Sequence, residues 1–281
     1  MKQIIACIDG SPLTEQVLNA TEWLAKKTEA PVTLLHALEK ANSQTHDLSG
    51  TIGFSSREHL LSELTELDEK RAKLALEHGR LLLDGAQAHL QQNGVSATPL
   101  QRHGDFVATL RDLEQDARVF IVGKQGTEHC QQHVIGSNLE HAARTLSQPI
   151  LVIPSEFSAP SSFMVAFDGR ETSIKALEKI ANSPLLKDIP CHLVMVKRDK
   201  SGQQETLDKA KSKLVDLGFN VTGHLIEGEN IQSTLLSFQQ QHKIDLIAMG
   251  AYAHSKVRQF FVGSNTTKML TESTVPVLIL R

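Results

Sequence analysis

Three glycine residues follow one apolar segment of the chain at a spacing that could bind an anion. Gly123 comes directly after the apolar run 119–122, Gly126 follows three residues later, and Gly136 opens a helical pattern after nine intervening positions. Glycine lets backbone N–H groups approach a ligand closely, because no Cβ stands in the way. The first turn of a helix adds unsatisfied N–H groups and the positive end of the helix dipole. This combination predicts a site for a polyphosphate.

The two common phosphate-binding motifs do not explain this spacing. A P-loop requires GxxxxGK[ST], which the residues from Gly123 to Thr127 do not supply. A dinucleotide fingerprint would place GxGxxG after the first strand, where Asp9-Gly10-Ser11 stands instead. The remaining pattern is Gly-x2-Gly-x9-Gly-Ser. It stands in a chain whose first apolar run ends in an aspartate.

The composition is that of a soluble globular protein. Hydrophobic residues make up 40% and charged residues 22% of the 281 residues, and the formal net charge is −3. Lysine and arginine are scattered along the chain, so we expect neither nucleic acid nor a membrane as a partner. Cys7, Cys130 and Cys191 form no CxxC pair, and the N-terminal apolar run is too short for a signal peptide. Both observations favour a cytoplasmic protein.

Short apolar runs alternate with helical patterns along the first half of the chain. The runs are continuously apolar, which is typical of parallel strands covered on both faces. Five strands with intervening helices predict an open parallel α/β sheet. The predicted strands are 4–8, 32–37, 95–101, 119–122 and 150–153, and the predicted helices are one that carries Leu13 to Leu24, then 57–92, 106–113 and 137–146.

The second half of the chain repeats the pattern of the first. Residues 164–169, reading MVAFDG, echo residues 5–10, reading IACIDG. Placing Gly250 on Gly123 also places Gly263 on Gly136 without a gap. Such a register indicates a duplication. We predict two domains, 1–154 and 162–281, joined by a short polar linker at 155–161.

On these residues the sequence resembles the universal stress protein family, in its tandem form with two domains in one chain. The resemblance implies two doubly wound five-stranded parallel sheets of order 3-2-1-4-5, like those of the adenine nucleotide alpha hydrolases. It also implies that the last strands, 150–153 and 277–280, pair antiparallel, so that one chain imitates a dimer. Association of two such chains into a homodimer stays open.

The resemblance further implies a nucleotide site in the first domain. Family members that bind ATP carry the same glycine pattern, which would contact phosphates and ribose, while an acidic residue after the first strand holds adenosine. All these positions follow the carboxyl ends of parallel strands, where an open α/β sheet has its crevice. The implied nucleotide-binding residues are Asp9, Ala37, Gly123, Gly126, Gly136, Ser137 and Asn138.

The second domain departs from this pattern at three positions. Ala253 replaces the middle glycine, Arg170 stands where the first domain has Ser11, and Lys197 takes the place of Ala37. A methyl group can block a backbone conformation that glycine allows. A second nucleotide site is therefore an open alternative, and its residues would be Asp168, Gly250, Gly263, Ser264 and Asn265.

Two further features have competing interpretations. His129 and His133 would share one face of a helix at a zinc spacing, but a complete ligand set is missing, so we predict a polar loop and no metal. The long helix 57–92 has an apolar stripe of leucines among charged residues. We predict that this stripe packs on the rest of the chain; the alternatives are that the extra length of the helix covers the crevice or docks a partner.

The predicted function is ATP or AMP binding by a cytoplasmic stress-response protein that acts as a sensor or regulator, with Mg²⁺ if the ligand is a triphosphate. The sequence shows no nucleophile elbow, paired carboxylates or HExxH motif, so we expect no enzyme beyond slow incidental hydrolysis. The alternative is a ligand-free tandem scaffold that binds protein partners, which the degraded second site favours.

Overall fold

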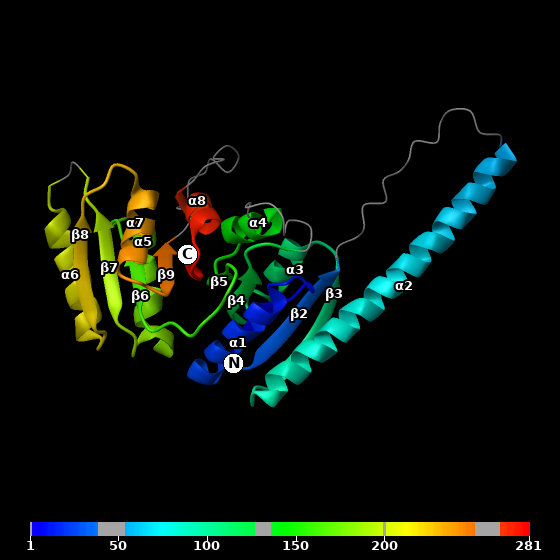
Figure 1. Cartoon of the computed structure of the whole chain (residues 1–281), viewed down its shortest axis with the longest axis horizontal. Coiled ribbons are helices and arrows are strands. Elements are labelled where there is room, and N and C mark those ends of the chain that lie inside the picture. Colours follow the sequence, from blue (N-terminus) through cyan, green and yellow to red (C-terminus); the bar gives the residue numbers. More distant parts are fainter. Residues whose placement is uncertain (1, 39–53, 127–135, 199–200, 251–264) are drawn as a thin grey trace.

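In both halves of the chain strands alternate with helices (Figure 1), and the computed structural model describes residues 2–38, 54–126, 136–198, 201–250 and 265–281. The first half contains β1 (Gln3–Cys7), α1 (Thr14–Thr28), β2 (Val32–Leu38), α2 (Phe54–Gln92), β3 (Ala97–His103), α3 (Phe106–Leu113), β4 (Ala117–Gly123), α4 (Ser137–Thr145) and β5 (Ile150–Ile153). The second half contains β6 (Phe163–Ala166), α5 (Glu171–Ala181), the 3-10 helix η1 (Pro184–Leu186), β7 (Cys191–Val196), α6 (Gln203–Asp216), β8 (Val221–Ile226), α7 (Ile231–Gln241), β9 (Leu246–Gly250), α8 (Asn265–Glu272) and β10 (Val277–Leu280). The predicted α/β class is confirmed.

The strands form one ten-stranded sheet in the order β3-β2-β1-β4-β5-β10-β9-β6-β7-β8. Neighbouring strands are parallel within each half, and each half has the predicted order 3-2-1-4-5. The halves join where β5 and β10 run antiparallel, with Leu151 opposite Leu278 and Val152 opposite Val277. The predicted pairing of the last strands is therefore confirmed.

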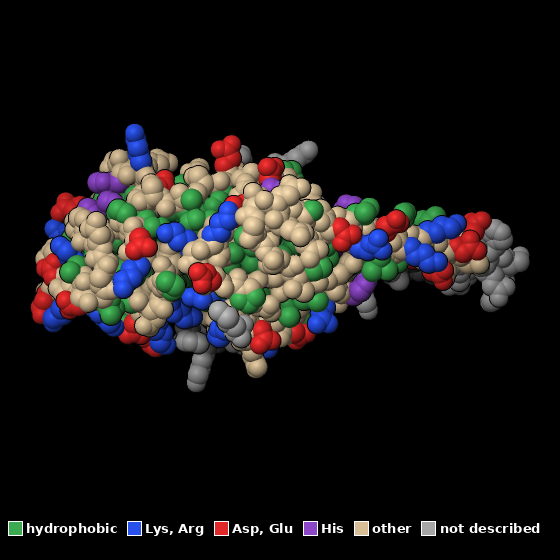
Figure 2. Space-filling view, turned by 90° about the horizontal axis from the view of Figure 1, so that it is seen from below, with side chains coloured by type: hydrophobic (Ala, Val, Ile, Leu, Met, Phe, Trp, Pro, Cys, Tyr) green, Lys and Arg blue, Asp and Glu red, His purple; other side chains and the backbone are tan. Residues whose placement is uncertain are grey.

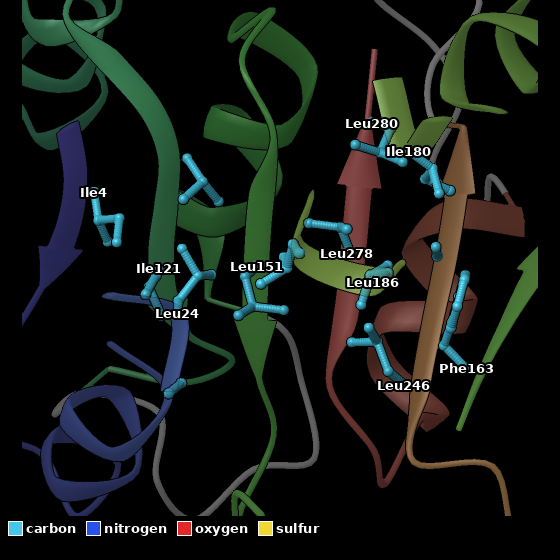
Figure 3. Packing of buried hydrophobic residues seen from close by; sticks show 14 of the residues in the cluster. Ile4, Leu24, Ile121, Leu151, Phe163, Ile180, Leu186, Leu246, Leu278 and Leu280 are labelled. Atoms are coloured by element: carbon cyan, nitrogen blue, oxygen red, sulfur yellow. The ribbon is translucent and has the colours of Figure 1, made fainter. Parts of the chain in front are cut away.

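Two apolar layers cover the faces of the sheet, and both layers continue through the junction. Helices α1, α2, α5 and α6 bury one face, and helices α3, α4, α7 and α8 bury the other. Figure 3 shows Leu151 on β5 and Leu278 on β10 within the first of these layers. The four residues of β5 are at most 1% exposed. Since truncating a buried leucine or isoleucine costs about 2 to 5 kcal/mol, neither half can present this strand to water without a large loss of stability.

Helix α2 packs differently from the prediction. Its C-terminal part buries Leu83, Ala86 and Leu90 against the sheet. In contrast, residues 62–78 are all exposed, and Figure 1 shows this part of the helix projecting away from the body of the molecule. The prediction that the leucines of the whole helix pack on the chain is wrong for this part. No helix in the described ranges combines the length and apolar character that a membrane span requires.

A cluster of histidines lies on one face of the second half, between β7, β8 and α7. The Nδ1 atom of His192 lies 3.1 Å from the Nε2 atom of His224, and both rings lie 5.7 Å from the ring of His242 between centroids. Phe238 stacks on His242 at 4.1 Å. Burial lowers the pKa of His192 and of His224, and the neighbouring histidines lower each pKa further. Lys211 also lowers the pKa of His224.

This cluster predicts that the second half is less stable in acid. Because the folded pKa values lie below the unfolded value of about 6.5, the unfolded chain takes up protons first as the pH falls. The contribution of His192 and His224 to the free energy of unfolding is therefore fully present above about pH 7. It is lost as the pH falls below the unfolded pKa of histidine. We expect the urea midpoint to drop between about pH 7.5 and 5.5, and to drop less in His224→Gln. An equal drop in both proteins would contradict this assignment.

Candidate functional site

A cavity opens at the carboxyl ends of β1, β2 and β4, where the N-terminus of α4 faces the sheet. Its volume is about 350 Å³, which lies within the range of about 300 to 1,000 Å³ that is typical of small-molecule sites. β1 lies between β2 and β4, so the cavity sits where the strand order reverses, as ligand sites of doubly wound sheets do. The structure places all seven predicted first-domain residues around it: Asp9, Ala37, Gly123, Gly126, Gly136, Ser137 and Asn138.

The carboxylate of Asp9 is held by a turn at the end of β1. Its Oδ1 atom accepts a hydrogen bond of 3.0 Å from the backbone N–H of Ser11. Gly10 forms this turn with a φ of 77°, a conformation that glycine adopts without steric cost. The other oxygen, Oδ2, lies 3.1 Å from the place where a Cβ of Gly126 would stand. Glycine at 126 therefore lets the loop after β4 approach Asp9 closely.

The N-terminus of α4 forms the opposite wall of the cavity. Gly136 is the N-cap residue, and within the described ranges no side chain caps this helix end. The backbone N–H of Gly136 donates to the carbonyl of Lys124 over 3.3 Å, which ties the helix start to the end of β4. An uncapped helix N-terminus presents N–H groups and a partial positive charge to whatever lies in front of it. This wall therefore favours an anionic ligand.

Several residues that the sequence did not indicate also line the cavity. Phe106, the first residue of α3, and Leu13 and Val17 of the α1 region supply apolar surface. Phe106 follows Asp105, whose side chain accepts from the N–H of Ala108 as an N-cap, and this helix start after a strand was the available sequence signal. The prediction considered only residues beside the glycines and strand ends.

Cys7 and His36 are buried residues that line the cavity. Burial raises the pKa of the Cys7 thiol, so it stays protonated. The Nδ1 atom of His36 lies 2.9 Å from the carbonyl oxygen of Ile8, which binds β2 to the end of β1. Its Nε2 atom is buried and has no hydrogen-bond partner among the residues that the structure describes. A protonated thiol is a weak nucleophile, so Cys7 forms part of the cavity wall and is not reactive.

Lys124 connects this cavity with the second half of the chain. It lines the cavity beside Gly123, yet its Nζ atom donates to the carbonyl oxygens of Thr271 and Ser273, over 2.5 and 3.1 Å. Those carbonyls lie at the C-terminal end of α8, where a cation is favourable. Burial lowers the pKa of Lys124. No local sequence pattern indicates this contact, because 147 positions separate Lys124 from Thr271.

A corresponding contact joins a cation of the second half to a helix of the first half. Arg281 donates from a guanidinium nitrogen to the carbonyls of Arg144 and Leu146, over 2.6 and 3.1 Å, at the C-terminal end of α4. Thr267 of α8 also donates to Glu140 of α4 over 3.4 Å. Figure 1 shows α4 and α8 next to each other above the junction. Each half therefore supplies a cation to the helix end of the other half.

The equivalent position in the second half holds a smaller cavity of about 140 Å³, lined in part by Asp168 and Gly250. Arg170 engages Asp168 twice: its backbone N–H lies 3.0 Å from Oδ1, and its Nε atom lies 3.4 Å from Oδ2. A Cβ on Gly250 would stand 2.7 Å from the carbonyl oxygen of Thr172. This glycine is therefore explained by packing against α5, and the aspartate by its ion pair.

The remaining predicted positions can be placed only in part. Asn265 is the first residue of α8. Gly263, Ser264, His129 and His133 lie outside the described residues. Among the residues that are described, no group of three or more His, Cys, Asp or Glu side chains is arranged to hold a metal ion.

Sequence comparison assigns the family. A model of the universal stress protein family matches residues 1–154 and 161–281. Universal stress protein Slr1230 of Synechocystis is 33% identical over 288 residues, with all of both chains covered. The chain therefore belongs to the universal stress protein family, as a tandem of two such domains.

Two further comparisons concern the sequence of one domain and the fold of the whole chain. Universal stress protein YxiE of Bacillus subtilis is 23% identical over 153 residues, which cover 54% of this chain and 97% of that protein. The crystal structure of a universal stress protein from Archaeoglobus fulgidus has a TM-score of 0.73 at 18% identity, with 99% of this chain and 98% of the other covered. The last comparison shows a shared tandem fold.

Replacing Lys124 should loosen the contact between the halves. Lys124→Met keeps an apolar stem but removes two charge-assisted hydrogen bonds, each worth about 1.5 to 3 kcal/mol when a charged group takes part, so we expect a loss of about 1 to 3 kcal/mol after relaxation. Urea unfolding of the full chain measures this loss. Lys175→Met, which removes only a surface ion pair with Glu171, is the control. Equal stability of the two variants would refute the role of Lys124.

Proposed function

We propose that the chain binds one adenine nucleotide, ATP or AMP, in the cavity of its first domain. The observation that supports this most strongly is that seven residues from four separate segments, identified by spacing and family resemblance alone, surround a single cavity. The cavity also has a volume suited to a small molecule, and the N-terminus of α4, which no described side chain caps, forms one wall.

The two ends of the proposed ligand fit different parts of the cavity. The second carboxylate oxygen of Asp9, Oδ2, suits a ribose hydroxyl, because a carboxylate accepts strong hydrogen bonds. Ala37 and Phe106 offer apolar surface for the adenine ring. The phosphates would lie at Gly126 and at the start of α4, where N–H groups and the helix dipole favour negative charge. Mg²⁺ would accompany a triphosphate, since it binds through phosphate oxygens and retains several waters.

We further propose that the protein holds its ligand without converting it. The ionisable side chains that line the described cavity are Cys7, Asp9, His36 and Lys124. The thiol is protonated, the carboxylate is committed on one side to Ser11, and Lys124 points its ammonium at α8. The ring of His36 is held through Nδ1 at the carbonyl of Ile8, and its Nε2 atom lies toward Gly79 of α2. None of them is placed as a base for an attacking water, so any hydrolysis of ATP would be slow and incidental.

In this proposal the chain is a nucleotide-dependent regulator of a cytoplasmic stress response. Nucleotide binding would act at the loop after Gly123, which also carries the contact of Lys124 with the second domain. The second domain fits a different role, because its cavity is small and its aspartate is paired with Arg170. It would serve as the structural partner and as a docking surface for other proteins.

Matched substitutions in the two domains test where the ligand binds. Asp9→Ala should weaken ATP binding about 10-fold to 100-fold, because it removes a charge-assisted hydrogen bond. Asp168→Ala should leave the affinity unchanged, because the equivalent carboxylate is paired with Arg170. Isothermal titration of each full-length variant with ATP and Mg²⁺, and separately with AMP, measures the affinity of each variant.

Gly126→Val provides a second test of the same site. Its Cβ would stand 3.1 Å from Asp9 Oδ2 and its branches would enter the cavity, so we expect binding to fall below detection while the fold is retained. Circular dichroism and thermal melting establish the fold. Unchanged ATP affinity in both Asp9→Ala and Gly126→Val, or no heat with the unaltered protein, would favour the ligand-free scaffold.

A further inference from the structure

The smaller cavity of the second half contains two buried polar side chains that are not bonded to the protein around them. Gln232 of α7 and Thr266 of α8 line this cavity and are only 3% and 7% exposed. No residue that the structure describes forms a hydrogen bond with the side-chain amide of Gln232 or with the hydroxyl of Thr266. Because a buried polar group without a partner opposes folding, native proteins rarely contain one that nothing satisfies. The two groups indicate that something other than the protein occupies the cavity.

Gln232 stands where the first half of the chain has an apolar residue. Helices α3 and α7 begin alike, with the side chains of Asp105 and Asn230 as their N-caps. Two positions after the cap, the first half has Val107, which is 2% exposed within the core, and the second half has Gln232. The side chain of Asn230 already accepts from the backbone N–H of Gln232. The helix end therefore does not need the amide of Gln232 as a cap.

Thr266 differs from its counterpart in the same way. In the gapless repeat Asn265 corresponds to Asn138, so Thr266 corresponds to Leu139. Leu139 is 2% exposed and belongs to the apolar core of the first half. The second cavity thus has polar groups at two positions that are apolar in the first half. Loss of a nucleotide site alone does not explain why these positions are polar.

The charge that this cavity leaves unpaired is positive. Arg198, which follows β7, lines the cavity. Its backbone N–H donates to Gln203 over 2.8 Å, but in the part of the chain that the structure describes its guanidinium has no ion-pair partner. The other charged side chain of the described lining, Asp168, is paired with Arg170. Figure 2 shows Lys and Arg side chains interspersed with Asp and Glu side chains over the body of the molecule, so nearby groups decide which ligand the cavity attracts.

The remaining walls of the cavity are apolar and lie close together. They include Phe167, Leu235, Met249 and Met269, which are at most 7% exposed. The volume of about 140 Å³ is below the lower limit of about 300 Å³ that is typical of sites for drug-sized molecules. The carbon atoms of a ligand can contact such walls, whereas an inorganic anion cannot use them. The cavity therefore fits a small organic anion and is too small for a nucleotide.

We propose that the second half binds a short-chain organic carboxylate in this cavity. The guanidinium of Arg198 holds the carboxylate, because its planar fork of N–H groups matches the two oxygens. Gln232 and Thr266 donate hydrogen bonds to a keto or hydroxyl oxygen of the same molecule, and its carbon atoms lie against the apolar walls. This site does not depend on nucleotide binding in the first domain.

Titration of the full-length chain with pyruvate, and separately with lactate, tests the proposal. Saturation-transfer NMR, which detects weak ligands, should show saturable binding of at least one of these carboxylates. Arg198→Met should raise its Kd at least about tenfold, because the charge-assisted hydrogen bonds are lost. Lys197→Met is the matched control, since it removes the neighbouring cation, which pairs with Glu227, and should leave the Kd unchanged. Absence of saturable binding, inorganic phosphate that binds as tightly as the carboxylates, or an unchanged Kd in Arg198→Met would overturn the proposal.

Gln232→Met separates the role of the amide in binding from a role in folding. Methionine has a similar length but no amide, so we expect the Kd of the carboxylate to rise about threefold to tenfold. Without ligand the urea midpoint should stay equal or rise, because a buried amide that lacks a partner is removed. A lower midpoint would show that the amide serves the fold, and would overturn its role in binding. The affinity for ATP should be the same in all these variants, which distinguishes this site from the one in the first domain.

Discussion

The antiparallel pairing of β5 with β10 is the interaction on which the rest of the structure depends. Each strand would be a continuously apolar edge strand if its half stood alone, and such an edge aggregates. Paired through Leu151 and Leu278, the two strands instead become the centre of a ten-stranded sheet. Both apolar layers continue through this junction, so the halves share their cores. The outer edges are then β3 and β8, and β3 carries Pro99, a residue that central strands exclude.

The direction of that pairing also decides where the two sites lie. Because the halves are antiparallel, the carboxyl ends of their strands face opposite edges of the sheet, and the two cavities are therefore apart. The same geometry places the end of β4 beside the C-terminus of α8, which is why Lys124 can reach it. It places Arg281 beside the C-terminus of α4 for the same reason. The pairing thus produces both the separation of the sites and the contacts through which one half can respond to the other.

Much of this arrangement could be predicted from the sequence, because it depends on local patterns. Continuous apolar runs predicted the strands, the gapless repeat predicted the duplication, and the glycine spacing with Asp9 selected residues that surround one cavity. The sequence shows that Arg170 departs from the first domain, which has Ser11 at this position. Its ion pair with Asp168 could not be predicted, because it depends on side-chain geometry. The contact of Lys124 with α8 depends on the packing of distant helices. The leucines of α2 show which face of the helix is apolar. They do not show that the helix extends beyond the sheet on which it packs.

The central claim is that one adenine nucleotide binds per chain, in the first domain. Native mass spectrometry of the intact chain with ATP and Mg²⁺ tests it most directly, because it counts bound ligands without assuming an affinity. The account predicts a single nucleotide adduct per chain that saturates as ATP is raised. Two adducts per chain would contradict the loss of the second site, and the absence of any adduct would contradict nucleotide binding itself.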